Sequence, residues 1–152
     1  MKSFKQLFLE EIRQKLGGFE NSLSTNQELK AAHDLCLKIE ELNPGLEALI
    51  VGGAVRDLVL GKQPHDVDIA TNVDIDILAD QFKSYDIGQS KSFGIVVIPF
   101  EGFQFEVAHY REDVGSSDHR RPDSVKLVKS FEKDSSRRDF TINSLGLNTN
   151  GE

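Results

Sequence analysis

A strand-to-helix turn with two consecutive glycines, Gly52 and Gly53, is the first feature of the sequence that could carry chemistry. Glycines at such a turn let a ligand approach the backbone closely, and the N–H groups at a helix start favour an anion such as phosphate. Arg56 lies one helical turn later, where its guanidinium would reach the same phosphates. The alternative is an ordinary tight turn followed by a surface arginine.

Three carboxylates, Asp66, Asp68 and Glu106, are candidate metal ligands. Residues two apart in a strand point to one face, so we expect Asp66 and Asp68, at a strand start, to project together. Two such carboxylates repel each other unless a cation lies between them, and their oxygens beside substrate phosphates suit Mg²⁺. Glu106, on the returning arm of a hairpin, is a candidate third ligand. Simple solvent exposure of these side chains is the alternative.

A second polar motif, RRDFTIN, occupies residues 137–143. Adjacent arginines on a helix diverge by about 100°, so only one of Arg137 and Arg138 would face a given site. A solvated charge run is the alternative for this motif alone. Combined with the glycine turn and the carboxylates, it predicts attack by a hydroxyl on the α-phosphate of a nucleoside triphosphate. Two metal ions about 4 Å apart would assist that reaction, which depends chiefly on electrostatic stabilisation.

The elements that must position these residues follow from hydrophobic spacing and from turn residues. We expect helices over residues 4–16, from a capping box at 25–28 to 42, over 54–60, from a cap at Asn72 to 82, and over part of 131–145. We expect strands over residues 46–51, 67–70, 94–100, 103–110 and 125–128, a turn at 101–102 and a loop over 111–124. The fold class is α+β, a small mixed or antiparallel sheet with helices packed on one side.

Composition limits the classes of function. The net charge of −7 argues against a broad nucleic-acid grip by this chain alone, because phosphate binding needs clustered lysine and arginine. No apolar run approaches the roughly 20 residues of a membrane span, so no membrane partner is expected. The single cysteine, Cys36, excludes an intrachain disulfide and a cysteine-rich zinc site, lies on an apolar helix face, and favours a cytoplasmic location.

Two segments resemble the motifs of one enzyme family. The run VGGAVRDLVLGKQPHDVDIAT, at residues 51–71, resembles the signature of class II tRNA nucleotidyltransferases (CCA-adding enzymes) and the related bacterial poly(A) polymerases. The run RRDFTINSLG, at residues 137–146, resembles their second motif. The likeness covers about residues 46–148.

The resemblance implies a polymerase-β-like nucleotidyltransferase head domain over residues 46–152, preceded by an N-terminal helical extension over 1–45. It implies metal aspartates at Asp66 and Asp68, with Glu106 a weaker correspondence. It implies nucleotide contacts by the Gly52–Gly53 turn, by Arg56 and by Arg138. The neck, body and tail domains of the family lie outside this sequence, so we expect either a head fragment or a separate partner chain that supplies them.

The activity implied is Mg²⁺-dependent transfer of CMP and AMP from CTP and ATP to an RNA 3′-hydroxyl, the tRNA CCA end first among acceptors. Two alternatives stay open. One is a poly(A) polymerase-type head, and the other is a nucleotide-binding or partner-binding module that does not turn over on its own.

Overall fold

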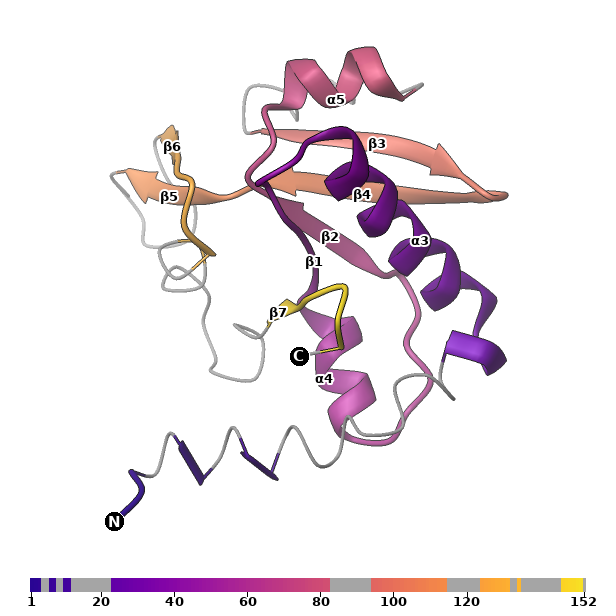
Figure 1. Cartoon of the computed structure of the whole chain (residues 1–152), viewed down its shortest axis with the longest axis vertical. Coiled ribbons are helices and arrows are strands. Elements are labelled where there is room, and N and C mark those ends of the chain that lie inside the picture. Colours follow the sequence, from indigo (N-terminus) through magenta and orange to yellow (C-terminus); the bar gives the residue numbers. More distant parts are fainter. Residues whose placement is uncertain are drawn as a thin grey trace.

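The computed structural model describes residues 1–3, 6–7, 10–11, 23–82, 94–114, 124–131, 134 and 146–151 of the 152-residue chain. Its centre is a five-stranded sheet in the order β3-β4-β2-β1-β7 (Figure 1). The strands are β1 (Ala48–Val51), β2 (Asp68–Thr71), β3 (Ile95–Phe100), β4 (Phe103–His109) and β7 (Gly146–Leu147). β2 and β4 run parallel, whereas the other neighbours are antiparallel. The expected mixed sheet is thus confirmed.

Three helices share one hydrophobic core with this sheet. They are α3 (Gln27–Leu42), α4 (Gly53–Val59) and α5 (Ile75–Gln81). The core combines apolar side chains of all three helices with Ile50, Ile69 and Val107 of the sheet. The expected α+β arrangement, with helices on one side, is therefore confirmed. No helix within the described ranges has both the length and the apolar character to cross a membrane.

Helix α3 is the main cover of that sheet face, as Figure 1 shows. Its expected apolar stripe is buried, including Leu29, Cys36 and Ile39, which are at most 1% exposed. Burial raises the pKa of the Cys36 thiol, because the thiolate would lose its hydration. Cys36 is therefore a core residue, as its position on the stripe predicts.

The expected start of α3 at Thr25 is wrong. Residues 23–25 are themselves helical, and the cap is Asn26, whose side-chain oxygen accepts from the Leu29 N–H at 3.0 Å. Both residue types cap helices well, so the local sequence does not separate them. The end of α3 agrees with the prediction, since Asn43 is its C-cap.

The cap of α5 is also displaced from the prediction. Asp74 precedes the helix, whereas the Asn72 side chain accepts from the Glu47 N–H at 2.8 Å. Asn72 therefore joins the end of β2 to the start of β1 instead of capping a helix. The β3–β4 turn is as expected, because Glu101 and Gly102 both have positive φ angles, 50° and 84°. Such angles at both turn residues are typical of a tight hairpin.

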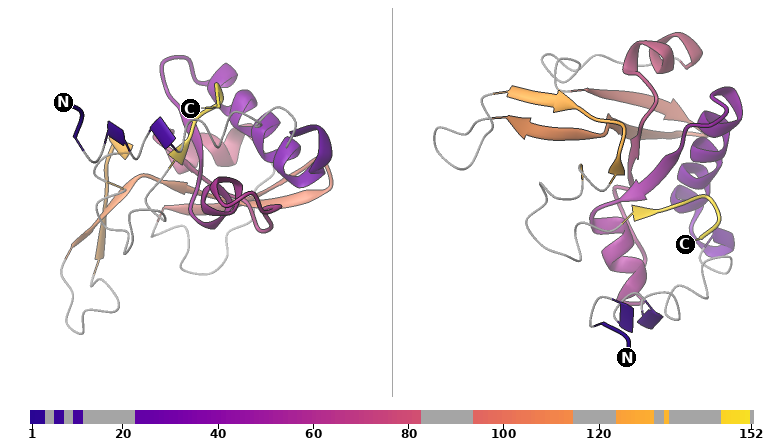
Figure 2. Two further views of the ribbon diagram at one scale, coloured as in Figure 1. Left: turned by 90° about the horizontal axis from the view of Figure 1, so that it is seen from below. Right: turned by 60° about the vertical axis from the view of Figure 1, so that its left-hand side comes forward.

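A second, two-stranded sheet extends away from the first (Figure 2). It pairs β5 (Arg111–Val114) with β6 (Ser124–Leu127). The loop expected over residues 111–124 is therefore wrong at both of its ends, where polar residues form a strand pair. The prediction was wrong because it read a loop from polar composition, whereas the pairing of these two strands is set by backbone hydrogen bonds. Residues 115–123 lie outside the described residues.

Two other predictions fall mostly outside the described residues. The first helix is described only at 6–7 and 10–11, and the helix expected over 131–145 only at Phe131 and Asp134, all of which are helical. Strand β7, next to β1, was not predicted. Its two residues are too few to give a periodic signal, and only pairing with β1 defines it.

Candidate active site

The turn from β1 to α4 places the two glycines at the end of a buried strand. Gly52, the N-cap of α4, has φ 70° and ψ −138°, a conformation essentially reserved for glycine. It follows Val51, the last residue of β1, and the Arg56 N–H donates to its carbonyl oxygen at 3.3 Å. The chain therefore turns directly from the sheet into the helix, and Gly53 opens that helix at the end of the sheet.

Arg56 folds back over this turn. A Cβ atom added to Gly53 would lie 3.2 Å from an Arg56 terminal guanidinium nitrogen. The Arg56 Nε lies 3.5 Å from an Asp57 carboxylate oxygen, and the arginine side chain is 43% exposed. The guanidinium thus sits against the glycine backbone while keeping access to solvent. This is where an arginine that contacts bound phosphates through its planar fork would lie.

Asp68 and Glu106 are neighbours across two parallel strands. Asp68 is the first residue of β2, and the pairing of Ile69 with Val107 places Asp68 next to Glu106 of β4. Ile69 and Val107 point into the core, so the two carboxylates, both exposed, point to the opposite face. Adjacent strands lie about 4.8 Å apart, which gives two like charges in close proximity.

Asp66 is not a strand residue. The expected strand over 67–70 begins one residue later, at Asp68, and Asp66 precedes it with a φ of 51°. The alternation of side chains in a strand therefore does not apply to Asp66, and the expectation that Asp66 and Asp68 project together from one strand is wrong. Asp66 is nonetheless exposed and only two residues from Asp68.

The donor set can be compared with what Mg²⁺ requires. Within the described residues, no group of three or more His, Cys, Asp or Glu side chains is arranged to hold a metal ion. Mg²⁺ keeps several waters and is commonly held by one or two carboxylates plus substrate phosphates. The carboxylates of Asp68 and Glu106, side by side and exposed, fit that smaller requirement.

The second motif ends at the same end of the sheet. Gly146, its last residue, pairs with Val51 immediately before the glycine turn. Gly146 is tightly enclosed, since an added Cβ would lie 2.8 and 2.9 Å from Phe131 ring carbons. Arg138 and the other residues of the motif before Gly146 lie outside the described residues.

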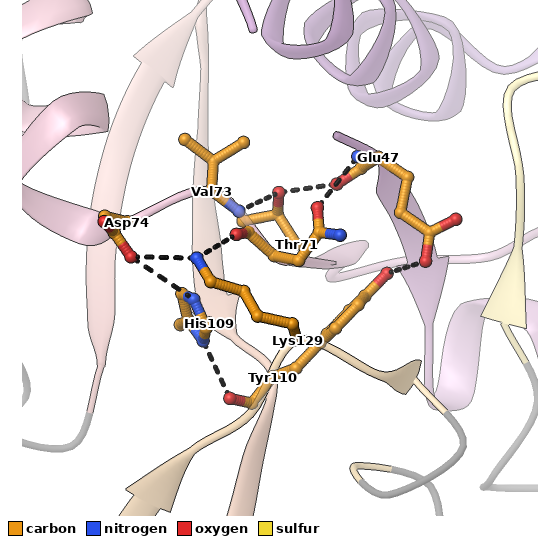
Figure 3. Close-up of polar contacts among 8 residues, drawn as sticks. Glu47, Thr71, Val73, Asp74, His109, Tyr110 and Lys129 are labelled. Atoms are coloured by element: carbon orange, nitrogen blue, oxygen red, sulfur yellow. Dashed lines mark hydrogen bonds and ion pairs between the residues drawn. The ribbon is translucent and has the colours of Figure 1, made fainter. Parts of the chain in front are cut away.

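A polar network supports the sheet where β4 leads into β5 (Figure 3). The fully buried Tyr110 donates its hydroxyl to a Glu47 carboxylate oxygen at 2.8 Å. Burial, first, and this hydrogen bond both raise the pKa of the Tyr110 phenol. Tyr110 is therefore a structural residue, and its partner Glu47, 63 residues away, carries no signal in the sequence.

The same network contains a buried histidine. His109 is 1% exposed, and its Nδ1 lies 2.7 Å from the Tyr110 carbonyl oxygen. A carbonyl only accepts, so Nδ1 carries the hydrogen. Its Nε2 lies 3.7 Å from a carboxylate oxygen of Asp74, which also accepts from the Lys129 Nζ at 3.1 Å (Figure 3). These contacts join the strand end to the start of α5, away from the carboxylate pair.

Comparison with known proteins shows the family of this chain. A family model described as the poly A polymerase head domain matches residues 48–152. The chain belongs to this family. The CCA-adding enzyme of Geobacillus thermodenitrificans is 47% identical over 115 residues, which are 74% of this chain and 28% of that enzyme. The resemblance carried by the two motifs is thereby confirmed.

Comparison with solved structures gives the same result for the fold. A crystal structure of the Bacillus stearothermophilus CCA-adding enzyme in complex with CTP is similar, with a TM-score of 0.68 and 35% identity over 80% of this chain and 28% of that chain. A tRNA nucleotidyltransferase complexed with a primer tRNA and an incoming ATP analogue has a TM-score of 0.52 and 29% identity, over 73% of this chain and 30% of that one. The nucleotidyltransferase head fold is confirmed.

This chain spans less than a third of the length of the relatives named above. It spans 28% of the length of the Geobacillus enzyme. The family match begins at residue 48, whereas α3 lies before it. The division of the chain into an extension over 1–45 and a head over 46–152 remains a prediction, although α3 packs into the same core as the sheet.

Proposed function

We propose that this chain is the catalytic head of a tRNA nucleotidyltransferase that adds CMP and AMP to an RNA 3′-hydroxyl, the tRNA CCA end in particular. The observation that supports it most is the convergence, at one end of the sheet, of the glycine turn, Arg56 and the carboxylates of Asp68 and Glu106. The CTP and tRNA complexes of the similar enzymes point to the same substrates.

In this proposal the triphosphate of CTP or ATP lies along the glycine turn. Backbone N–H groups at Gly52 and Gly53 donate to phosphate oxygens, and the guanidinium of Arg56 binds the same group through its planar fork. Arg138 of the second motif adds a further cation, as the family resemblance implies. These contacts align the α-phosphate for attack along the line of the leaving group.

Asp68 and Glu106, with Asp66, would hold Mg²⁺ at this end of the sheet. When bound, two such ions supply charge neutralisation at the attacking and the leaving oxygens. The RNA 3′-oxygen forms a bond to the α-phosphorus and gives its proton to solvent. The bond from the α-phosphorus to the oxygen that bridges to the β-phosphate breaks, and pyrophosphate leaves. The protein residues bind and orient both reactants throughout.

The test is incorporation of labelled CMP and AMP into a tRNA lacking its 3′ CCA, with Mg²⁺. We expect three additions that end in A, and loss of incorporation in the Asp66→Ala, Asp68→Ala double variant. Full activity in that variant would exclude the proposed metal site. A long tail of A residues would instead identify a poly(A) polymerase. Binding of Mg²⁺ and triphosphate without pyrophosphate release would identify a binding module that requires other parts for turnover.

A further inference from the structure

The segment that carries Asp66 is contacted by the N-cap and the first turn of α3, which lie outside the part of the chain that the family model matches. The segment connects α4 to β2, and its tip is formed by His65 and Asp66, both exposed. Pro64 before the tip and Val67 after it are buried. Asp66 itself has a φ of 51°, in the left-handed region, which is strained for most residues other than glycine and which aspartate tolerates better than most.

Asn26 makes the principal contacts with this segment. Its side-chain nitrogen donates to the Pro64 carbonyl oxygen at 3.1 Å and to the Gln63 side-chain oxygen at 3.1 Å. Its side-chain oxygen accepts from the Leu29 N–H at 3.0 Å and caps α3. One amide group therefore joins the first turn of α3 to the backbone two residues before Asp66.

A second contact from the same helical turn holds the other side of Asp66. The Val67 N–H donates to a Glu28 carboxylate oxygen at 3.5 Å, a long hydrogen bond. The backbone is thus contacted at Pro64 by the N-cap of α3 and at Val67 by a residue of its first turn. Helix α3 also packs against the sheet that carries Asp68. The position of the Asp66 segment relative to Asp68 is therefore set through α3.

We propose that Asn26 is a positioning residue that fixes Asp66 relative to Asp68 for binding of a divalent cation. This inference rests on the proposed function, which makes Asp66 and Asp68 ligands of one metal site. Without the Asn26 side-chain nitrogen, the Pro64 carbonyl loses its hydrogen bond to Asn26, and the segment at His65 and Asp66 can adopt more conformations. Cation binding must then select one of them, which weakens affinity without removing a ligand.

Two variants separate this role from helix capping. Asn26→Ser and Asn26→Asp both keep an oxygen that caps α3, and both lose the amide nitrogen that reaches Pro64 and Gln63. The aspartate side chain has no donor, whereas the serine hydroxyl is a donor on a shorter side chain. Binding of Mn²⁺ to the full chain, followed by electron paramagnetic resonance of the free ion, measures affinity without turnover. We expect roughly tenfold weaker Mn²⁺ binding in both variants, the lower end of what losing an orienting group costs a metal site.

Two controls define what the result means. Asn72→Ala removes one side-chain hydrogen bond, to the Glu47 N–H, beyond the opposite end of β2 from Asp68. We expect this control to change Mn²⁺ affinity less than twofold, even where its loss of thermal stability equals that of Asn26→Ser. Gln63→Ala leaves the Asn26 bond to Pro64 in place and should likewise bind almost normally.

The outcomes are distinguishable. Affinities within twofold of the original chain in folded Asn26→Ser and Asn26→Asp would overturn the inference and leave the proposed function standing. An equal loss in Asn72→Ala would overturn it as well, because the effect would then be general destabilisation. If the unaltered chain binds no Mn²⁺, the metal site of the proposed function fails and the inference fails with it.

Discussion

Replacement of Gly146 by alanine tests the junction between the second motif and the glycine turn. Gly146 does not have a positive φ, so alanine can adopt its backbone conformation and the cost is steric. The new Cβ would lie 2.8 and 2.9 Å from two ring carbons of Phe131 and 3.1 Å from a methyl carbon of Leu49. Carbon atoms in contact prefer roughly 3.5–4.0 Å, so the aromatic ring or β7 must move.

The magnitude follows from these contacts. Forcing an extra carbon into a packed site costs about 1–3 kcal/mol, and replacing glycine returns about 0.4–1 kcal/mol through the unfolded chain. The difference between these two ranges is a net loss of at most about 2.6 kcal/mol. Because three atoms lie within 3.1 Å of the new carbon, we expect a net loss of about 1–2 kcal/mol in the free energy of unfolding. For a domain of this size that corresponds to a fall in Tm of roughly 2–8 °C.

The assay is urea denaturation of Gly146→Ala, Phe131→Leu and the double variant. The smaller leucine side chain leaves room for the added methyl, so the two changes should cost about 1 kcal/mol less together than the sum of their separate costs. Strict additivity, or a Gly146→Ala protein as stable as the original, would refute the contact between β7 and Phe131 on which this reasoning depends.

Three further predictions concern individual side chains. In EDTA, Glu106→Gln should raise the free energy of unfolding by up to about 1 kcal/mol, because it removes the repulsion between Glu106 and Asp68. At a Mg²⁺ concentration tenfold above Kd, the original chain should gain about 1.4 kcal/mol and the variant should gain less. A variant that is destabilised in EDTA would contradict the placement of Glu106 next to Asp68. Tyr110→Phe should cost about 1–2 kcal/mol near pH 7 through the lost bond to Glu47. Because the pKa of Tyr110 is raised in the folded state, its contribution to stability is fully present below about pH 10 and is lost as the pH rises towards the folded-state pKa. The free energy of unfolding should therefore fall less steeply with rising pH in the variant. Cys36 should react with a thiol reagent only on unfolding, and rapid reaction of the native chain would disprove its burial.

Features of the fold that depend on residues close together in the sequence could be predicted, and features that depend on distant residues could not. The buried stripe of α3 and the turn at Glu101 and Gly102 depend on local spacing and turn chemistry, and both agree with the prediction. The helix caps at Asn26 and Asp74 differ from the prediction, because several neighbouring residues are equally suitable caps and contacts with distant residues decide which one is used. Asn26 binds Gln63 and Pro64, which no local pattern specifies.

The candidate site shows the same division. The glycine turn and Arg56 are consecutive in sequence, so their proximity could be anticipated. The proximity of Asp68 and Glu106 depends on the parallel pairing of β2 with β4. Periodicity along one strand cannot specify which strand becomes its neighbour, and it failed for Asp66, where the chain leaves the extended conformation.

The burial of α3 has a practical consequence for anyone who trims this protein. Leu29, Leu35 and Ile39 are each fully shielded from water, and covering three such side chains is worth about 5–9 kcal/mol, comparable with the whole stability of many domains. A polypeptide that starts at residue 46 would leave Ile50 and Ile69 uncovered on an open sheet face. We expect it to precipitate or to be found as inclusion bodies, whereas one that starts before Leu23 should stay in solution.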